Sequence, residues 1–277
     1  MVTDPYREFR QAVEQPEANI DLGRAALTIA LADYPDLDIA SYLRRIDELA
    51  VAVSQRAGAD ADVYRSIAAL NYVLFKEQGF RGNRDDYYDP KNSFLNDVIE
   101  RKRGLPITLS ILYMEVGQRI GLTIDGVGFP GHFLVKTKSE TDEIIIDPFN
   151  AGDVKSHEDL QAMLDQIYGG KVRLHRDLLA ALPKRQILKR MLANLKAIYG
   201  RRDELVKMVA VLDRLIILDP TAAEEVRDRG AVYLRLECYG QAKDDFETYL
   251  RLAPDAKDAA AIRQQLADLA KHTVLLH

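Results

Sequence analysis

The sequence has few of the residues that cross-link or anchor a fold. Its 277 residues include one cysteine, Cys238, and no tryptophan. A single cysteine excludes an internal disulfide, which suits a protein of a reducing compartment. No apolar run approaches the roughly 18 residues of a membrane-spanning helix. Residues 1–8 also lack the basic and apolar regions of a secretory signal. We therefore expect a cytoplasmic protein that does not bind a membrane.

Positive charge is not in excess either. The chain has 38 Lys and Arg against 43 Asp and Glu, which gives a net charge of −5. Nucleic-acid binding requires clustered positive charge. The basic run at residues 100–103 is short and is typical of a solvated helix end. The composition therefore predicts no nucleic-acid partner.

Metal-ligand and cofactor motifs are also missing. Four of the histidines, His157, His175, His272 and His277, show no spacing typical of a metal site. Asp85, Asp86 and Asp89 lack the closing glutamate of a calcium-binding EF-hand. The glycines at residues 126–131 are not followed by the helix that a dinucleotide site requires. We expect no metal and no cofactor.

The stretch from Gly104 to Asn150 contains the most informative pattern. Gly104 and Leu105 interrupt the chain, and Pro106 suits the first position of a helix because its missing N–H has no partner there. Apolar residues then recur at helical spacing and also cover a second face: Ile107, Leu109, Ile111, Leu112, Tyr113, Met114, Val116 and Ile120. Such a pattern predicts a buried helix over residues 106–120. Gly121 is placed to end it.

Two strands are predicted after this helix, over residues 132–137 and 143–147. A four-residue turn at 138–141 would pair Thr137 with Asp142, and the same register would pair His132 with Asp147. Residues directly opposite each other in an antiparallel pair share a face and lie close together. The pattern therefore permits a His132–Asp147 hydrogen bond, which would fix the tautomer of the imidazole as in catalytic triads.

Four motifs carry a family resemblance: Asn92-Ser93-Phe94-Leu95-Asn96, Gly104-Leu105-Pro106-Ile107-Thr108-Leu109-Ser110, Gly126-Val127-Gly128-Phe129-Pro130-Gly131-His132-Phe133 and Asp147-Pro148-Phe149-Asn150. They resemble the transglutaminase-like superfamily, a relative of papain-type folds, and within it the SirB family. The resemblance covers nearly the whole chain. It implies a catalytic Cys at the start of a buried helix, with His and Asp on the strands that follow. His132 and Asp147 match the latter two, whereas Pro106 stands at the position of the Cys.

The rest of the first 183 residues is predicted to be mainly helical. Helices are expected from Asp4-Pro5 toward Val13, over 20–34, 39–55 and 61–77, and from Asn92-Ser93 to Arg101. A further helix over 157–168 begins at Ser156, where Asp159 completes a motif close to a capping box, and ends at Gly169-Gly170. Residues 79–92 form a polar loop that contains Tyr87 and Tyr88. The predicted fold class is α+β, a mainly helical core with a small antiparallel sheet.

The final 94 residues resemble tetratricopeptide repeats. Pro220 and Pro254 follow similar sequences and lie 34 residues apart (254 − 220), which is the period of that repeat. The second unit has the expected residues at the expected offsets: Gly230, Tyr233, Ala242, Phe246 and Pro254. The first unit has Met208 where a small residue is usual. We predict a core over 1–183, a helical tail over 184–277, and a last helix over 256–271. Cys238 lies near a turn between paired helices.

Three functions are compatible with these features. A cysteine hydrolase lacks its nucleophile, since Pro106 cannot attack and Cys238 lies in the tail. A hydrolase or acyltransferase would use Ser110, one helical turn after Pro106, together with His132 and Asp147. A serine inside a helix, however, usually hydrogen-bonds to a carbonyl one turn earlier.

The third function, which we favour, is a non-catalytic protein- or peptide-binding module. The tetratricopeptide tail would bind a protein or peptide partner, and the candidate binding surface comprises Tyr87, Tyr88, Asn92 and Tyr233. The SirB resemblance implies a regulatory role in gene expression by a route that it does not specify. The sequence leaves the oligomeric state open.

Overall fold

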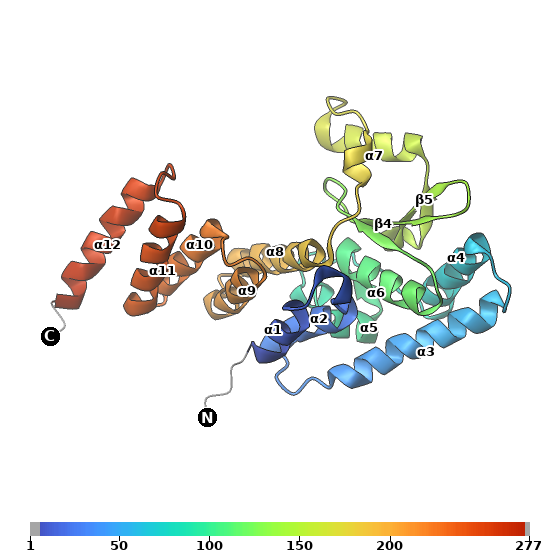
Figure 1. Cartoon of the computed structure of the whole chain (residues 1–277), viewed down its shortest axis with the longest axis horizontal. Coiled ribbons are helices and arrows are strands. Elements are labelled where there is room, and N and C mark those ends of the chain that lie inside the picture. The colour runs from blue at the N-terminus through green and yellow to red at the C-terminus, as the bar shows by residue number, and fades with distance from the viewer. Residues whose placement is uncertain (1–5, 275–277) are drawn as a thin grey trace. The chain divides into compact units, whose positions relative to one another are not determined.

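The computed structural model describes residues 6–274 of the chain and the side chains of residues 6–269. It divides into two compact units, which we call the core unit, Gln11–Met191, and the tail unit, formed by the described parts of Met1–Arg10 and Leu192–His277. The predicted α+β class is confirmed, since a mainly helical chain carries small sheets (Figure 1). The domain boundary near Pro183 stays a prediction. The two units divide inside helix α8, Lys184–Arg202.

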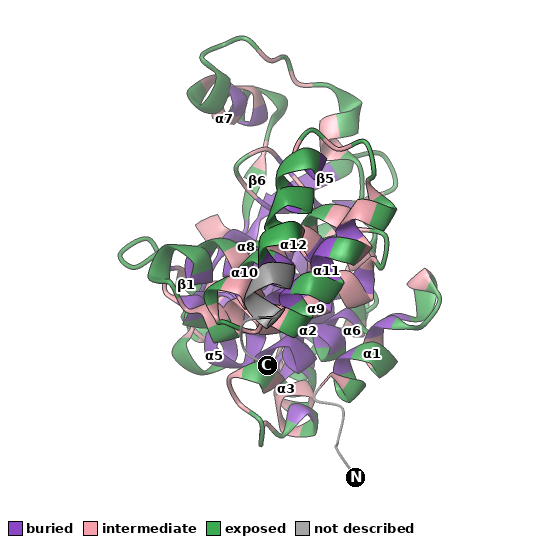
Figure 2. Cartoon of the chain, turned by 90° about the vertical axis from the view of Figure 1, so that its left-hand side faces the viewer, coloured by how far each residue is buried: buried purple, intermediate pink, exposed green. Residues whose placement is uncertain are grey.

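Helix α6, Pro106–Arg119, lies at the centre of the core unit, as its apolar pattern predicts. It contacts α2 (Leu22–Ile29), α3 (Ile39–Ala57), α4 (Val63–Asn71), α5 (Leu95–Arg101) and the first two strands of the larger sheet. Ile111, Leu112 and Tyr113 are 0–1% exposed, and α6 is largely purple in Figure 2. The helix ends where predicted. Gly121 has φ +86°, and the Leu122 N–H donates to the Gly117 carbonyl at 3.0 Å, a Schellman arrangement.

The larger sheet has four antiparallel strands in the order β3-β4-β5-β6. Their bounds are β3, Asp125–Val127; β4, Leu134–Lys138; β5, Glu143–Asp147; and β6, Asp153–Lys155. Helix α7, His157–Tyr168, packs on this sheet through a shared apolar cluster: Val127, Phe129, Leu134, Ile145, Leu160 and Leu164. The predicted bounds of β5 and α7 are confirmed, including the Ser156–Asp159 capping box.

The predicted register of the β4–β5 hairpin is wrong by two residues. Thr137 pairs with Ile144, not with Asp142, and β4 begins at Leu134, two residues after His132. The turn lies one residue later than expected because Ser139 closes it. Its N–H donates to the Asp142 carbonyl, and its Oγ accepts from the Asp142 N–H, both at 2.9 Å. A shift of two residues keeps each side chain on its face, whereas a shift of one would not.

Helices of the first hundred residues follow the predicted order with altered bounds. The helix predicted over 39–55 extends to Ala57, whereas the one predicted over 20–34 is α2, Leu22–Ile29, followed by a 3-10 turn, Ala30–Ala32. Helix α1 is Arg7–Val13, and the predicted start at Asp4-Pro5 lies outside the described residues. The segment predicted as one helix over 61–77 is α4 followed by a π-helical turn, Tyr72–Glu77. The helix expected from Asn92 begins at Leu95, because Pro90–Asn92 forms a separate 3-10 turn. A short parallel pair, β1 (Arg81–Gly82) and β2 (Arg103–Gly104), joins the loops on either side of α5.

The tail unit contains α9, Leu205–Leu218; α10, Ala223–Arg235; α11, Tyr239–Leu252; and α12, Ala259–Val274. Cys238 directly precedes α11, as predicted. A Cβ on Gly230 would lie 2.9 Å from the Phe246 ring, so glycine there lets α10 and α11 approach closely. The space for Met208 is made at Gly200, where an added Cβ would lie 3.1 Å from the Met208 Cε. Tetratricopeptide repeats usually have a small residue at the position of Met208. Here Gly200, on the facing helix, is the small residue that lets the two helices pack.

Gly230→Ala is predicted to destabilise the chain by about 1–3 kcal/mol, because overpacking against Phe246 outweighs the higher helix propensity of alanine. Urea unfolding followed by circular dichroism measures the change. Gly240→Ala, also in a tail helix but with no atom within 4 Å of the added Cβ, is the matched control and should be neutral or stabilising by up to about 1 kcal/mol. Equal effects of the two substitutions would contradict this packing explanation.

Candidate functional site

The predicted pairing of His132 with Asp147 is present in the core unit. His132 Nε2 lies 2.9 Å from Asp147 Oδ1. A carboxylate only accepts hydrogen bonds, so the proton of this bond lies on Nε2 of the imidazole. The bond forms despite the shifted register. It joins the turn before β4 to the last residue of β5.

Asp147 is fully buried and receives donors from the turn that it begins. Its Oδ1 accepts from the N–H groups of Phe149 and Asn150 at 3.1 and 3.3 Å, and its Oδ2 accepts from the Asn150 side-chain amide at 2.6 Å. The Lys155 ammonium lies 3.9 Å from Oδ2. Burial by itself raises the pKa of Asp147. Its hydrogen bond and charge interaction with His132, together with Asn150 and Lys155, outweigh burial and hold that pKa below its ordinary value.

His132 lies in the tight turn before β4. Its own N–H donates to the Phe129 carbonyl at 3.0 Å, and Gly131 has φ +66°, a conformation that favours glycine. The guanidinium of Arg190 donates to the carbonyls of Phe129 and His132 at 2.9 and 2.5 Å. No motif in the sequence singles out Arg190, which stands 58 residues after His132. The Phe149 ring meets the imidazole edge to face at 5.8 Å between ring centroids.

The candidate nucleophile positions lie on α6. Pro106 is buried at the first helical position, where the Thr108 hydroxyl accepts from the Leu105 N–H at 3.0 Å and donates to the Asn92 carbonyl at 2.7 Å. Ser110 is 0% exposed, and its Oγ has no hydrogen-bond partner among the described residues, His132 included. Cys238 belongs to the tail unit. The residues described thus give His132 no hydrogen-bonded nucleophile.

The predicted binding residues divide into three environments. Tyr87 and Tyr88 are 39% and 51% exposed on the loop before α5. Asn92 is 0% exposed and is not a surface residue. Its amide donates to the carbonyls of Asp86 and Tyr87 at 2.6 and 3.3 Å, so it holds the loop in place. Tyr233 is half-buried against the apolar cluster of the tail unit.

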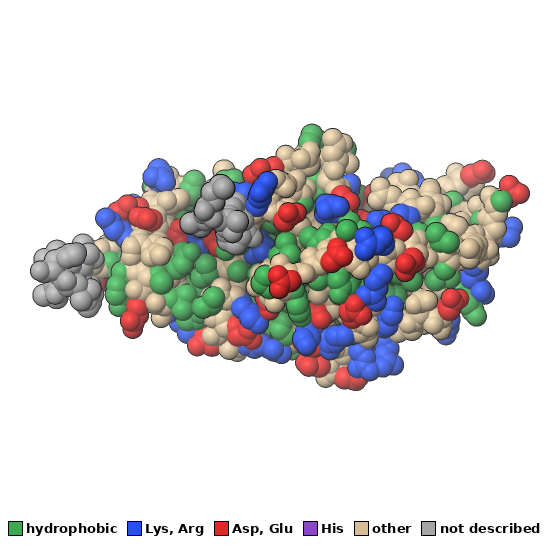
Figure 3. Space-filling view, turned by 90° about the horizontal axis from the view of Figure 1, so that it is seen from below, with side chains coloured by type: hydrophobic (Ala, Val, Ile, Leu, Met, Phe, Trp, Pro, Cys, Tyr) green, Lys and Arg blue, Asp and Glu red, His purple; other side chains and the backbone are tan. Residues whose placement is uncertain are grey.

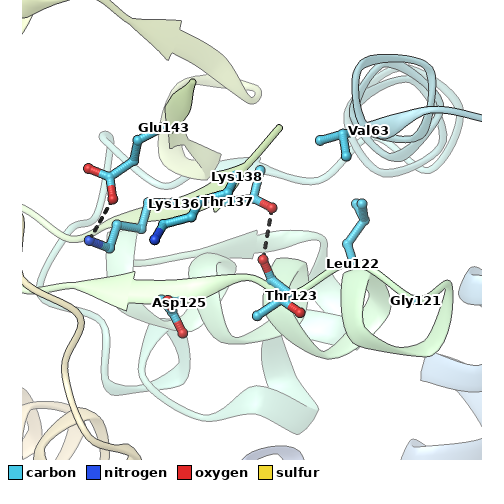
Figure 4. Close-up of a pocket in the computed structure, with 9 residues that line it drawn as sticks. All are labelled: Val63, Gly121, Leu122, Thr123, Asp125, Lys136, Thr137, Lys138 and Glu143. Atoms are coloured by element: carbon cyan, nitrogen blue, oxygen red, sulfur yellow. Dashed lines mark hydrogen bonds and ion pairs between the residues drawn. The ribbon is translucent and has the colours of Figure 1, made fainter. Parts of the chain in front are cut away.

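A separate cavity of about 470 Å³ lies at the other end of the hairpin. It is lined by Val63, Gly121, Leu122, Thr123, Asp125, Lys136, Thr137, Lys138 and Glu143 (Figure 4). Lys136 pairs with Glu143 at 2.9 Å, and the Thr137 hydroxyl donates to the Thr123 carbonyl at 2.8 Å. The cavity includes neither His132 nor Asp147, so it is distinct from the candidate site.

The surface and the helices add three observations. On the face in Figure 3, basic and acidic side chains of the described residues are interspersed. Among the described side chains, those of residues 6–269, no cluster of His, Cys, Asp or Glu is arranged to hold a metal ion. The side chains of His272 and His277 lie outside this range. None of the described helices combines the length and apolarity that a membrane crossing requires.

Comparisons with known proteins identify the family. Residues 40–193 match the model of the transglutaminase-like superfamily, and residues 195–267 match a tetratricopeptide repeat model. A UPF0162 protein of Xylella fastidiosa is 35% identical over 265 residues, 94% of each chain. A UPF0162 protein of Vibrio cholerae is 28% identical over 268 residues, 96% of each chain. The chain therefore belongs to the transglutaminase-like superfamily and, within it, to the family of UPF0162 proteins.

A more distant relative shares only part of the chain. Human F-box only protein 21 is 31% identical over 143 residues, which is 49% of this chain and 22% of that protein. No solved structure shows a significant match. The predicted architecture of a transglutaminase-like core followed by tetratricopeptide repeats is confirmed by the two family models.

His132→Ala is predicted to destabilise the fold by about 1–3 kcal/mol, because it removes a donor from a buried carboxylate. Urea unfolding at pH 7 measures the loss. His175→Ala is the control. The His175 side chain is 56% exposed and lies 3.5 Å from Asp177, so its removal should change stability by no more than about 0.5 kcal/mol. A His132 variant as stable as the His175 variant would show that the pair does not support the fold.

The lowered pKa of Asp147 predicts an acid-sensitive contribution to stability. A carboxyl whose pKa is lower in the folded state stabilises the protein above its unfolded pKa of about 3.9, and this stabilisation is lost as the pH falls through the folded value. The free energy of unfolding should therefore fall below about pH 4, and less steeply in Asp147→Asn than in the wild type. Asp153→Asn, at an exposed carboxyl, should retain the wild-type slope. Parallel curves for the wild type and the Asp147 variant would refute this assignment.

Proposed function

We propose that this chain is a non-catalytic member of the transglutaminase-like superfamily that serves as a protein- or peptide-binding module. The observation that carries the proposal is the start of α6, where Pro106 occupies the position at which the superfamily resemblance expects Cys. Proline has no group that attacks a carbonyl. His132 and Asp147 then act as a structural pair that joins the turns flanking β4 and β5.

The tetratricopeptide tail supports the binding half of this proposal, since such repeats stack into extended surfaces used for protein recognition. The further resemblance to the SirB family supports a regulatory role in gene expression. The presence of a single cysteine supports a cytoplasmic location.

The alternative is a hydrolase or acyltransferase that uses Ser110 with His132 and Asp147. The observation in its favour is that the buried Ser110 hydroxyl has no hydrogen-bond partner among the described residues, which is unusual in a native core. Two facts oppose it. The hydroxyl is not hydrogen-bonded to the imidazole that would activate it. Free N–H groups that could stabilise an oxyanion occur only in the first turn of α6, and Ser110 lies beyond that turn.

Covalent probes distinguish the two functions. We expect no mass increase when the full chain is incubated with a fluorophosphonate, and iodoacetamide should modify only Cys238. Intact-mass spectrometry of the wild type and of Ser110→Ala measures both reactions, and the iodoacetamide adduct confirms that the assay detects labelling. A stoichiometric fluorophosphonate adduct that disappears in both Ser110→Ala and His132→Gln would overturn the non-catalytic proposal in favour of the serine enzyme.

A further inference from the structure

A cavity of about 370 Å³ lies on the core unit between the end of α3 and one face of α4. It is lined by the last two residues of α3 and by residues that recur at helical spacing along α4 and the turn after it: Arg56, Ala57, Arg65, Ala68, Ala69 and Tyr72. We call this cavity the arginine pocket. It shares no residue with the cavity of Figure 4 or with the His132–Asp147 pair.

Both charges that line the arginine pocket are positive. Arg56 and Arg65 are exposed, and neither guanidinium forms an ion pair with a carboxylate of the described residues. Asp62 does not line the pocket. Its carboxylate accepts from the Arg65 backbone N–H at 2.7 Å, as the N-cap of α4. The Arg65 guanidinium donates one hydrogen bond, to the Ala57 carbonyl at 3.1 Å, out of the five that arginine can donate. The pocket thus has unmatched positive charge and N–H donors to spare.

The Tyr72 ring orients one of the two arginines. The guanidinium carbon of Arg56 lies 3.2 Å from the centroid of that ring. At this distance a tilted guanidinium would push a nitrogen into the ring, so the two planes are close to parallel. Stacking of this kind leaves the N–H groups in the plane of the guanidinium, directed past the edge of the ring. Arg56 is therefore pre-oriented, which lowers the entropic loss when it binds a ligand.

The backbone at Tyr72 is unusual. Tyr72 begins the π-helical turn, and the Gln78 N–H donates to the Val73 carbonyl, five residues earlier, at 2.9 Å. Turns of this kind are rare and occur frequently at functional sites. Val73 and Leu74 are 1% exposed, whereas the Tyr72 ring beside them is 42% exposed. The turn thus buries two apolar side chains and keeps the tyrosine at the surface, beside the arginines.

We propose that the arginine pocket binds an acidic segment of a partner protein, whose Asp or Glu side chains pair with Arg56 and Arg65. The planar fork of arginine matches the two oxygens of a carboxylate. A phosphate fits less well. Phosphate sites commonly use free N–H groups at a helix start, whereas α3 ends at this pocket and Asp62 already caps α4. This inference rests on the proposed binding function and names the chemistry of the partner.

The test uses the full chain and a fluorescein-labelled ten-residue peptide of alternating Glu and Ala, followed by fluorescence anisotropy. A peptide of alternating Gln and Ala has nearly the same shape without the charge and is the reference ligand. We expect saturable binding of the Glu peptide and at least about tenfold weaker binding of the Gln peptide, because charge-assisted hydrogen bonds are lost. Raising the salt concentration from about 0.05 M to about 0.5 M should weaken binding of the Glu peptide.

The double variant Arg56→Gln/Arg65→Gln should weaken binding of the Glu peptide at least about tenfold, in line with the loss of arginine anchors at an interface. Arg44→Gln/Arg173→Gln is the matched control. It removes the same two charges at exposed arginines of the core unit that do not line the pocket. This control should bind the Glu peptide within about twofold of the wild type, because exposed charges that do not touch the ligand are screened by salt.

Tyr72 is a positioning residue, and two variants test that role. Tyr72→Ala removes the ring against which Arg56 stacks and should weaken binding of the Glu peptide about threefold or more. Tyr72→Phe keeps the ring and should bind as the wild type does. A loss in Tyr72→Phe as large as that in Tyr72→Ala would contradict the stacking argument.

Circular dichroism and urea unfolding establish that each variant is folded. If the double variant unfolds, the single variant Arg56→Gln replaces it, because it leaves the Arg65 hydrogen bond to Ala57 in place. Equal affinity for the Glu and Gln peptides would overturn the proposal. Wild-type affinity in a folded arginine variant, or an equal loss in the Arg44/Arg173 control, would do the same.

Three further ligands separate failure of this inference from failure of the proposed function: a peptide of alternating Lys and Ala, a phosphoserine peptide and a single-stranded oligonucleotide. Tighter binding of any of them than of the Glu peptide would overturn the assignment to an acidic segment. If only the Lys peptide binds, the inference fails and the binding function stands. Fluorophosphonate labelling of Ser110 would overturn the proposed function whatever the peptides do. Preferential binding of the Glu peptide that depends on the two arginines would support both.

Discussion

The buried carboxylate of Asp147 imposes the main constraint on the centre of the core unit. A carboxylate without exposed surface must be supplied with donors, since water cannot reach it. The donors come from two segments: the imidazole of His132 before β4, and the backbone and side chain of the turn that follows β5. The hydrogen bonds to the Asp147 carboxylate therefore hold the turn before β4 and the turn after β5 in place relative to each other. Arg190 adds a third segment, because its guanidinium holds the carbonyls at both ends of the His132 turn.

The start of α6 links this centre to the loop that carries the exposed tyrosines. No side chain caps the helix at Leu105, so the Thr108 hydroxyl satisfies the Leu105 N–H and donates to the Asn92 carbonyl. Asn92 then holds the loop through its side chain. Under the proposed binding function, this helix start serves to support the loop and does not hold a nucleophile.

Local signals in the sequence were sufficient for much of the fold. The apolar pattern after Pro106, the Ser156–Asp159 pair and the isoleucine run before Pro148 predict α6, α7 and β5, because each depends on residues close together in the chain. The hairpin register depended on which residue closes the turn, and Ser139 closes it one residue later than composition suggests. Two residues of the site lay beyond sequence reasoning. The burial of Asn92 and the contacts of Arg190 depend on partners that only the folded chain brings near.

The short parallel pair β1–β2 has a consequence for how this family can diversify. The Arg81 N–H donates to the Lys102 carbonyl at 2.9 Å, and the Asn83 N–H donates to the Gly104 carbonyl at 3.1 Å. These bonds close the base of the loop beside the first turn of α6. The tip of the loop can therefore change in sequence or in length while these backbone hydrogen bonds keep its base in place.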